Sequence, residues 1–214
     1  MIRLRRAAGG AVAACVVGTA AVMYGLGVLP EPWLRGYISE GGVASSPRHW
    51  VYRTGIVLVA ASLVLLGAAL RRLVPYVCAV LVTAGGFGAV SAAVSCTPGC
   101  PLPPYERSTP TDLVHAGASM VAVGLAMVAM GGVAAISLQP ALRRTARVFF
   151  AVSLPLMAAL VFGLLALGRG LFTSVLERVA LVPPVGWVAA TGLLVLLDRS
   201  AGTSPARAGT VRRG

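Results

Sequence analysis

The chain has 214 residues, of which 57% are hydrophobic and 11% charged, and its formal net charge is +12. A soluble core of this size cannot hide so much apolar surface, so the composition excludes an ordinary soluble domain and indicates that lipid is the solvent for much of the surface. The 18 basic residues are all Arg, and their placement between apolar runs explains the positive charge without a nucleic-acid partner.

Six apolar runs of 18 to 25 residues follow one another along the chain. A hydrocarbon layer of about 30 Å requires roughly 20 helical residues, and backbone groups in lipid are satisfied only within helices or closed barrels. Because the runs are continuous rather than alternating, they predict helices, and therefore an all-α polytopic membrane protein with six transmembrane helices in one bundle. The predicted spans are Ala7–Leu29, Val51–Leu70, Leu73–Ser95, Leu113–Ser137, Val148–Gly168 and Ala180–Leu197.

The first and last runs each need interpretation. The first follows an Arg-rich start at residues 3–6 and therefore resembles a secretory signal, but its apolar character continues past Cys15 to Leu29. A cleaved signal gives way to a polar mature start, so we interpret this run as a retained helix. The last run contains Pro183 and Pro184 in its first turns, which leaves the start of the sixth helix open by several residues.

Arg residues alternate in number between successive gaps, which predicts the orientation. The N-terminus, the second gap, the fourth gap and the tail carry 12 Arg and one acidic residue, whereas the other three gaps carry six Arg and five acidic residues. Under the positive-inside rule both termini are expected in the cytoplasm. Residues 1–198 are the predicted transmembrane domain, and residues 199–214, rich in Ser, Gly, Pro, Thr and Arg, are predicted to be a disordered basic cytoplasmic tail.

The first outer gap is the longest and carries aromatic residues that fit a membrane-interface belt. Its stretch Ser39-Glu40-Gly41-Gly42 is either a turn with a helix cap or part of a ligand-binding surface.

In the second outer gap, Cys96 and Cys100 flank a Pro/Gly turn. If this gap faces an oxidising space, the two cysteines can close a small disulfide, while Cys15 and Cys78 lie within spans and should remain thiols. The alternatives are two free thiols or a metal-binding pair. A redox motif is disfavoured, because such motifs normally have a tighter spacing and a setting that stabilises the thiolate.

The fourth span opens with the most chemical stretch of the chain, Thr111-Asp112-Leu113-Val114-His115. Asp112 and His115 share a face of the first helical turn, where a carboxylate can orient an imidazole for metal binding or proton transfer. In the structural alternative, Thr111 or Asp112 caps the helix and His115 lies at the membrane interface.

The third outer gap, residues 170–179, either lies along the membrane surface or begins the sixth helix. Glu177 and Arg178 are adjacent and therefore point in different directions on a helix. Each needs a partner elsewhere, which Asp112, Glu40 or a lipid headgroup can supply.

Three stretches together resemble the bacterial "domain of unknown function 998" membrane proteins. They are Tyr37-Ile38-Ser39-Glu40, Asp112 with His115, and Leu176-Glu177-Arg178-Val179. The likeness extends over nearly the whole chain and implies a six-helix fold in a bacterial cytoplasmic membrane, an unassigned activity, and a functional surface at these positions. The chain has Gly41-Gly42 where the resemblance leads us to expect a Leu-Gly pair.

Three functions are compatible with these observations. The favoured one is a binding or scaffold protein whose outer cluster recognises a lipid headgroup or a membrane partner, including a second copy of the chain; the cluster is Glu40, Asp112, His115 and Arg178. The second is a membrane hydrolase or transferase in which His115 is the base or a metal ligand, Asp112 orients it, and Ser39 or Glu40 contributes. Because two His match no metal motif, no metal or cofactor is expected. The third, a small transporter, is disfavoured because the spans contain few polar groups.

Overall fold

The structure is a computed structural model that describes residues 2–27 and 36–198. Within these residues it contains six long helices, one short 3-10 helix and no strand. The predicted tail, residues 199–214, lies outside the described residues. The elements are α1 (Ile2–Leu26), η1 (Ile38–Gly42), α2 (His49–Leu70), α3 (Pro75–Ala93), α4 (Pro110–Ile136), α5 (Pro140–Ala166) and α6 (Leu171–Leu197).

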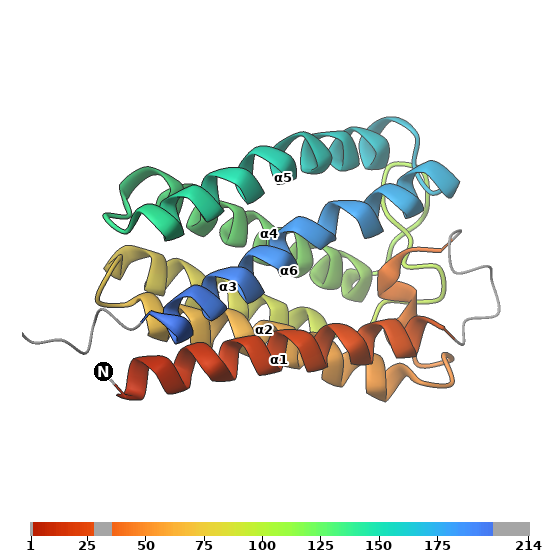
Figure 1. Cartoon of the computed structure of the whole chain (residues 1–214). Helices are drawn as coiled ribbons and strands as arrows, with labels where there is room; N and C mark the ends of the chain where they lie inside the picture. The colour runs from red at the N-terminus through yellow and green to blue at the C-terminus, as the bar shows by residue number, and fades with distance from the viewer. Residues whose placement is uncertain (1, 28–35, 199–214) are drawn as a thin grey trace, which may run out of the picture.

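The long helices form one bundle in which each packs against the next along the chain, and α6 packs back against α1 (Figure 1). The beginning of α1 and the α2–α3 and α4–α5 turns lie at one end of the bundle. The η1 helix and the connection from α3 to α4 lie at the other end. Segments far apart in the sequence are therefore brought together at the η1 end.

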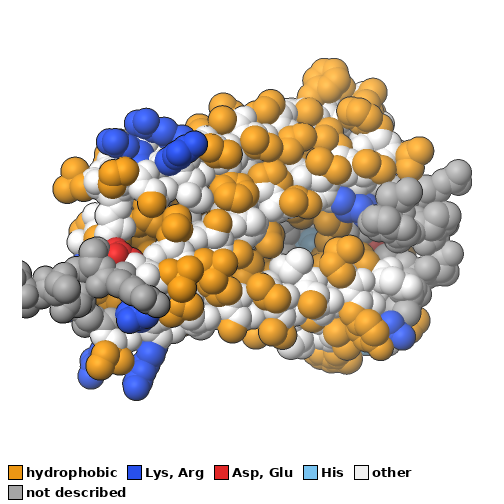
Figure 2. All heavy atoms as spheres, in the orientation of Figure 1, with side chains coloured by type: hydrophobic (Ala, Val, Ile, Leu, Met, Phe, Trp, Pro, Cys, Tyr) orange, Lys and Arg blue, Asp and Glu red, His pale blue; other side chains and the backbone are white. Residues whose placement is uncertain are grey.

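The surface of the bundle is apolar along its length. All six long helices are long and apolar enough to cross a membrane. Large side chains such as Val16, Phe162 and Leu165 are more than half exposed, and Figure 2 shows hydrophobic side chains covering the middle of the visible face. Such a surface is stable in lipid and not in water. The predicted all-α fold with six membrane-spanning helices is confirmed.

Several helices extend beyond the predicted apolar spans. The sixth begins at Leu171, nine residues before the predicted start of its span at Ala180, and Pro183 and Pro184 lie inside it. Residues 171–179 therefore begin the sixth helix. The fifth helix begins at Pro140, and its first turns carry Arg side chains before the apolar part.

Glycines allow α1 and α2 to approach closely. A Cβ atom on Gly18 would lie 2.8 Å from the carbonyl oxygen of Gly55, and a Cβ on Gly55 would lie 2.8 Å from that of Gly18. Because lipid removes the hydrophobic drive for helix association, such close backbone contact supplies much of the packing energy.

The two ends of the bundle differ in charge. Figure 2 shows basic side chains gathered at the end where α1 begins. We call this the arginine end, and its described arginines are Arg3, Arg5, Arg6, Arg71, Arg72, Arg143, Arg144 and Arg147. Four of the five described acidic residues lie at the opposite end, namely Glu40, Glu106, Asp112 and Glu177.

Candidate functional site

The candidate site is the segment Gly36–Gly42, which contains η1 and rests on the ring of Tyr52; we call it the η1 platform. A Cβ atom on Gly41 would lie 2.6 Å from Tyr52 Cδ2, and one on Gly42 would lie 3.0 Å from Tyr52 Cε1. Tyr52 is buried, and its base packs on α1, where a Cβ on Gly25 would lie 2.9 Å from Tyr52 Cβ. The ring therefore has little room to move, which explains why glycine rather than leucine occupies position 41.

An ion pair ties the platform to the α5–α6 turn. Arg169 Nη2 donates to Glu40 Oε1 at 2.7 Å, and their side chains are 33% and 13% exposed. The same carboxylate oxygen accepts the backbone N–H of Tyr37 at 2.9 Å. Glu40 therefore holds the start of η1 and presents, with Arg169, a partly exposed pair of opposite charges.

Two adjacent residues of α6 hold the backbone of the platform. Glu177 Oε2 accepts the N–H of Ile38 at 2.8 Å. Arg178 Nη1 donates to the carbonyl of Gly36 at 2.8 Å and to that of Ser174 at 2.8 Å. Asp112, Glu40 or a lipid headgroup as a partner of these two side chains stays a prediction. The hydrogen bonds named here go to backbone groups, because a polar loop at a membrane interface must have its N–H and C=O groups satisfied.

Tyr37 closes the underside of the platform. It is buried and packs against Val43, Cys96 and Cys100. Burial raises the pKa of Tyr37 to about 12, and the negative charge of Glu177 contributes to the increase. The phenol is therefore neutral at physiological pH.

Asp112 caps α4 and anchors the α3–α4 connection. Its carboxylate accepts the N–H of Thr97 at 2.6 Å and the N–H of Thr109 at 2.8 Å, and both hydroxyls also donate to it. In return, Thr109 Oγ1 accepts the N–H of Asp112 at 3.3 Å. This reciprocal pattern is a capping box. These contacts agree with the predicted alternative in which the start of α4 is capped, although the residue at the cap position is Thr109 rather than Thr111.

His115 contacts the end of α3 and not Asp112. Its Nδ1 lies 2.9 Å from the carbonyl oxygen of Ser91 and 2.8 Å from that of Val94. Because carbonyls only accept, Nδ1 carries the proton. Arg53 donates to the carbonyls of Ala92 and Ala93 in the same turn. The two side chains thus satisfy carbonyls that the end of a helix leaves without partners.

The α3–α4 connection also contains the two outer cysteines. Cys96 and Cys100 are paired as a disulfide with their Cα atoms 5.1 Å apart, while Cys15 and Cys78 are thiols within α1 and α3. Cys96 lies against Ser39 of the platform, with its sulfur 3.9 Å from the backbone carbonyl. The oxidation state of the pair in the cell stays a prediction.

The predicted site residues therefore divide into two groups. Glu40 and Arg178 meet at the platform, whereas Asp112 and His115 each serve a helix end and share no hydrogen bond. Within residues 2–27 and 36–198, no three His, Cys, Asp or Glu side chains are placed to hold a metal ion. Sequence reasoning missed Tyr52, and it counted Arg53 and Arg169 only as charges. The signal that the sequence offered for Arg169 was its position, as an Arg in the short turn before α6.

Comparison with known protein families gives a match over most of the chain. The family described as "Protein of unknown function (DUF998)" matches residues 7–194. No curated protein and no solved structure shows a significant match. The matched region includes all six long helices except for a few residues at the two ends, together with the platform.

Proposed function

This chain belongs to the DUF998 family of proteins of unknown function, and from that premise we propose that it acts by binding, with the η1 platform as its recognition surface for a lipid headgroup. We further propose that the platform faces away from the cytoplasm, as the excess of Arg at the opposite end indicates. The localisation in a bacterial cytoplasmic membrane is part of the same proposal.

One observation carries the proposal. The charged side chains of two separate motifs converge on a single loop, because Glu177 binds the N–H of Ile38, Arg178 binds the carbonyl of Gly36, and Arg169 binds Glu40. Partly burying charged side chains costs desolvation energy, so their use to fix a loop supports the proposal that the shape of this loop is important. A fixed loop loses little entropy when a ligand binds, which favours recognition.

The exposed pair on the platform indicates the chemistry of the ligand. Arg169 can hold a phosphate through two parallel hydrogen bonds, and Glu40 can accept hydrogen bonds from an ammonium group. A zwitterionic headgroup such as phosphatidylethanolamine carries both groups. It can therefore insert between Arg169 and Glu40, so that its phosphate binds Arg169 in place of the Glu40 carboxylate and its ammonium group binds Glu40 in place of the Arg169 guanidinium.

The hydrolase alternative has less support. It required Asp112 to orient His115, but the Asp112 carboxylate binds Thr97 and Thr109 instead. The Nδ1 atom of His115 is committed as a donor to two carbonyls, so it cannot accept the proton of Ser91, whose hydroxyl is 3.4 Å away. Only the other ring nitrogen is left to act as a base.

Phosphatidylethanolamine is expected to bind the purified full-length chain about tenfold more tightly than phosphatidylcholine, which corresponds to about 1.4 kcal/mol. The choline headgroup has the same phosphate, but its methylated nitrogen has no N–H to donate to Glu40. Native mass spectrometry of the protein titrated with each lipid measures the ratio. Arg169→Gln should weaken phosphatidylethanolamine binding about tenfold, because the phosphate loses its charged donor.

The matched control is Arg107→Gln, which removes the same charge from an exposed residue of the same end that forms no ion pair or hydrogen bond with the described platform residues. It should leave the lipid ratio unchanged. Equal binding of the two lipids by the unmodified chain, or an equal loss in both variants, contradicts headgroup recognition by the platform.

A further inference from the structure

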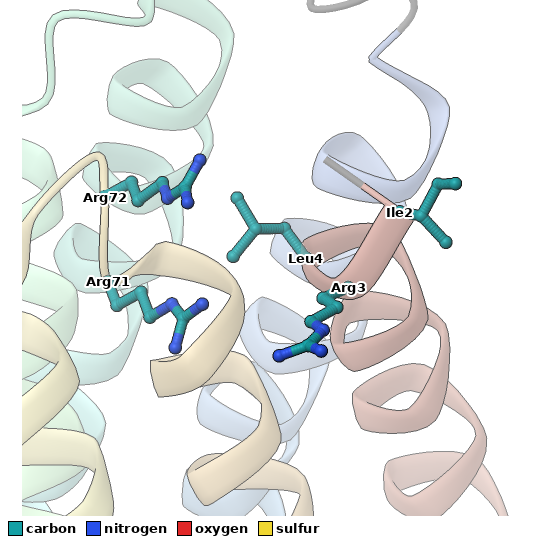
Figure 3. A pocket seen from close by; sticks show the side chains of 5 residues that line it. All are labelled: Ile2, Arg3, Leu4, Arg71 and Arg72. Atoms are coloured by element: carbon teal, nitrogen blue, oxygen red, sulfur yellow. The ribbon is translucent and has the colours of Figure 1, made fainter.

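The arginine end contains a groove that plays no part in the function proposed above. It lies between the start of α1 and the turn that joins α2 to α3 (Figure 3), and its volume is about 490 Å³. Its walls are formed by the first turn of α1 and the turn after α2, which lie far apart in the sequence. The residues that line it are Ile2, Arg3, Leu4, Arg71 and Arg72.

The groove contains three positive charges and no negative one. Figure 3 shows the side chains of Arg3 and Arg71 pointing toward each other across the gap, with Arg72 above them. Within the described part of the chain, none of the three side chains makes a hydrogen bond or an ion pair. The one described carboxylate at this end, Asp198, accepts a hydrogen bond from Gln139 at 3.4 Å. Like charges that face one another repel, weakly where water screens them, and an anion bound between them makes the interaction favourable.

Other arginines at this end have different environments. Arg5 donates to the carbonyl of Leu196 at 3.0 Å, and Arg147 donates to that of Ala134 at 3.1 Å. These two therefore serve helix ends and hold neighbouring helices together. The three arginines of the groove remain available to a ligand, and the planar guanidinium group matches the oxygens of a phosphate.

The apolar side of the groove favours a lipid over a free anion as its ligand. Leu4 points into the gap between the arginines, whereas the side chain of Ile2 points away from it on the other side of α1 (Figure 3). A free phosphate would use the arginines and leave Leu4 in water. A phospholipid would place its phosphate on the arginines and its acyl chains along Leu4 and the apolar side of the bundle.

We propose that this groove is a binding site for an anionic phospholipid, which Arg3, Arg71 and Arg72 hold by its phosphate. The site is independent of the η1 platform, since it lies at the opposite end of the bundle and involves a negatively charged rather than a zwitterionic lipid. Loss of one site should leave binding at the other unchanged.

The test measures the affinity of phosphatidylglycerol for the purified full-length chain by native mass spectrometry. The double variant Arg71→Gln/Arg72→Gln should weaken binding at least tenfold. Arg3→Gln, on the other wall, should weaken it severalfold and tests the same site if the double variant does not fold. Phosphatidylcholine should bind the unmodified chain at least tenfold more weakly than phosphatidylglycerol.

The matched control is Arg143→Gln/Arg144→Gln, which removes the same two charges from the same end but outside the groove. It should keep phosphatidylglycerol affinity within twofold of the unmodified chain. An equal loss in both double variants would show a general charge effect and overturn the proposal. Competition by inorganic phosphate at concentrations comparable to the lipid would assign the groove to a free anion, and equal binding of the two lipids would also overturn it.

Discussion

Asp112→Ala is expected to lower the free energy of unfolding by about 3 kcal/mol, because it leaves two backbone N–H groups without an acceptor in a buried place. These groups belong to Thr97 and Thr109, and they donate to the carboxylate at 2.6 and 2.8 Å. Asp112 is only 1% exposed, so in the native structure the carboxylate rather than water serves these two N–H groups. The variant also removes the reciprocal cap of α4, which adds to the loss.

The measurement is unfolding of the purified protein in mixed micelles, followed by helical circular dichroism as the fraction of denaturing detergent rises. Asp112→Asn is the graded control, since it keeps one oxygen and the shape of the side chain and should cost less than half as much. Inert substitutions change the free energy of unfolding by no more than roughly 0.5 kcal/mol. A change within that limit for Asp112→Ala contradicts the structural role. The carboxylate would then be free to serve a ligand.

Gly41→Leu is expected to destabilise the chain by about 2 to 3 kcal/mol and to displace the platform. The first side-chain atom alone would lie 2.6 Å from the ring of Tyr52, and that ring is buried against α1 and cannot move away. Overpacking of this kind forces backbone shifts, and here the shift falls on the segment that Glu177 and Arg178 hold.

A double-mutant cycle isolates the cause. Tyr52→Ala creates space beneath position 41, so Gly41→Leu should cost at least 1.5 kcal/mol less in the Tyr52→Ala background, roughly the size of coupling found between residues in contact. Gly42→Ala is a milder comparison, because its Cβ would lie 3.0 Å from the ring. Equal costs of Gly41→Leu in the two backgrounds would show that Tyr52 is not the obstacle.

The fold could be predicted from the sequence because lipid restricts the possible structures. A continuous apolar run of sufficient length has to be a helix, so six runs indicate six helices. The ends of the helices were harder to predict from the sequence. The predicted sixth span begins at Ala180, and the sequence left open whether residues 170–179 lie along the membrane surface or begin the helix; α6 begins at Leu171. The side chains of Glu177 and Arg178 bind backbone groups of a loop about 140 residues earlier, and no local pattern contains that contact.

The site was predicted only in part for the same reason. The motif that contains Glu40 and the motif that contains Arg178 were identified as functional positions by resemblance, and the structure brings them together. The pairing of Asp112 with His115 rested on helical spacing alone. Spacing shows which side chains share a face, but the partners of both residues lie on the α3–α4 connection and the end of α3, where spacing within one helix carries no information.

Labelling of cysteines in intact bacteria that produce the chain tests the central claim, that the η1 platform faces away from the cytoplasm. Cys96 and Cys100 are buried, so the probe at this end is Arg107→Cys, at an exposed position, in a chain whose four native cysteines are replaced by Ala. It should react with a membrane-impermeant maleimide in intact cells. Arg72→Cys in the same background should react only after the membrane is opened. Labelling of Arg72→Cys from outside, with Arg107→Cys protected, contradicts the orientation and with it the proposed functions of both ends.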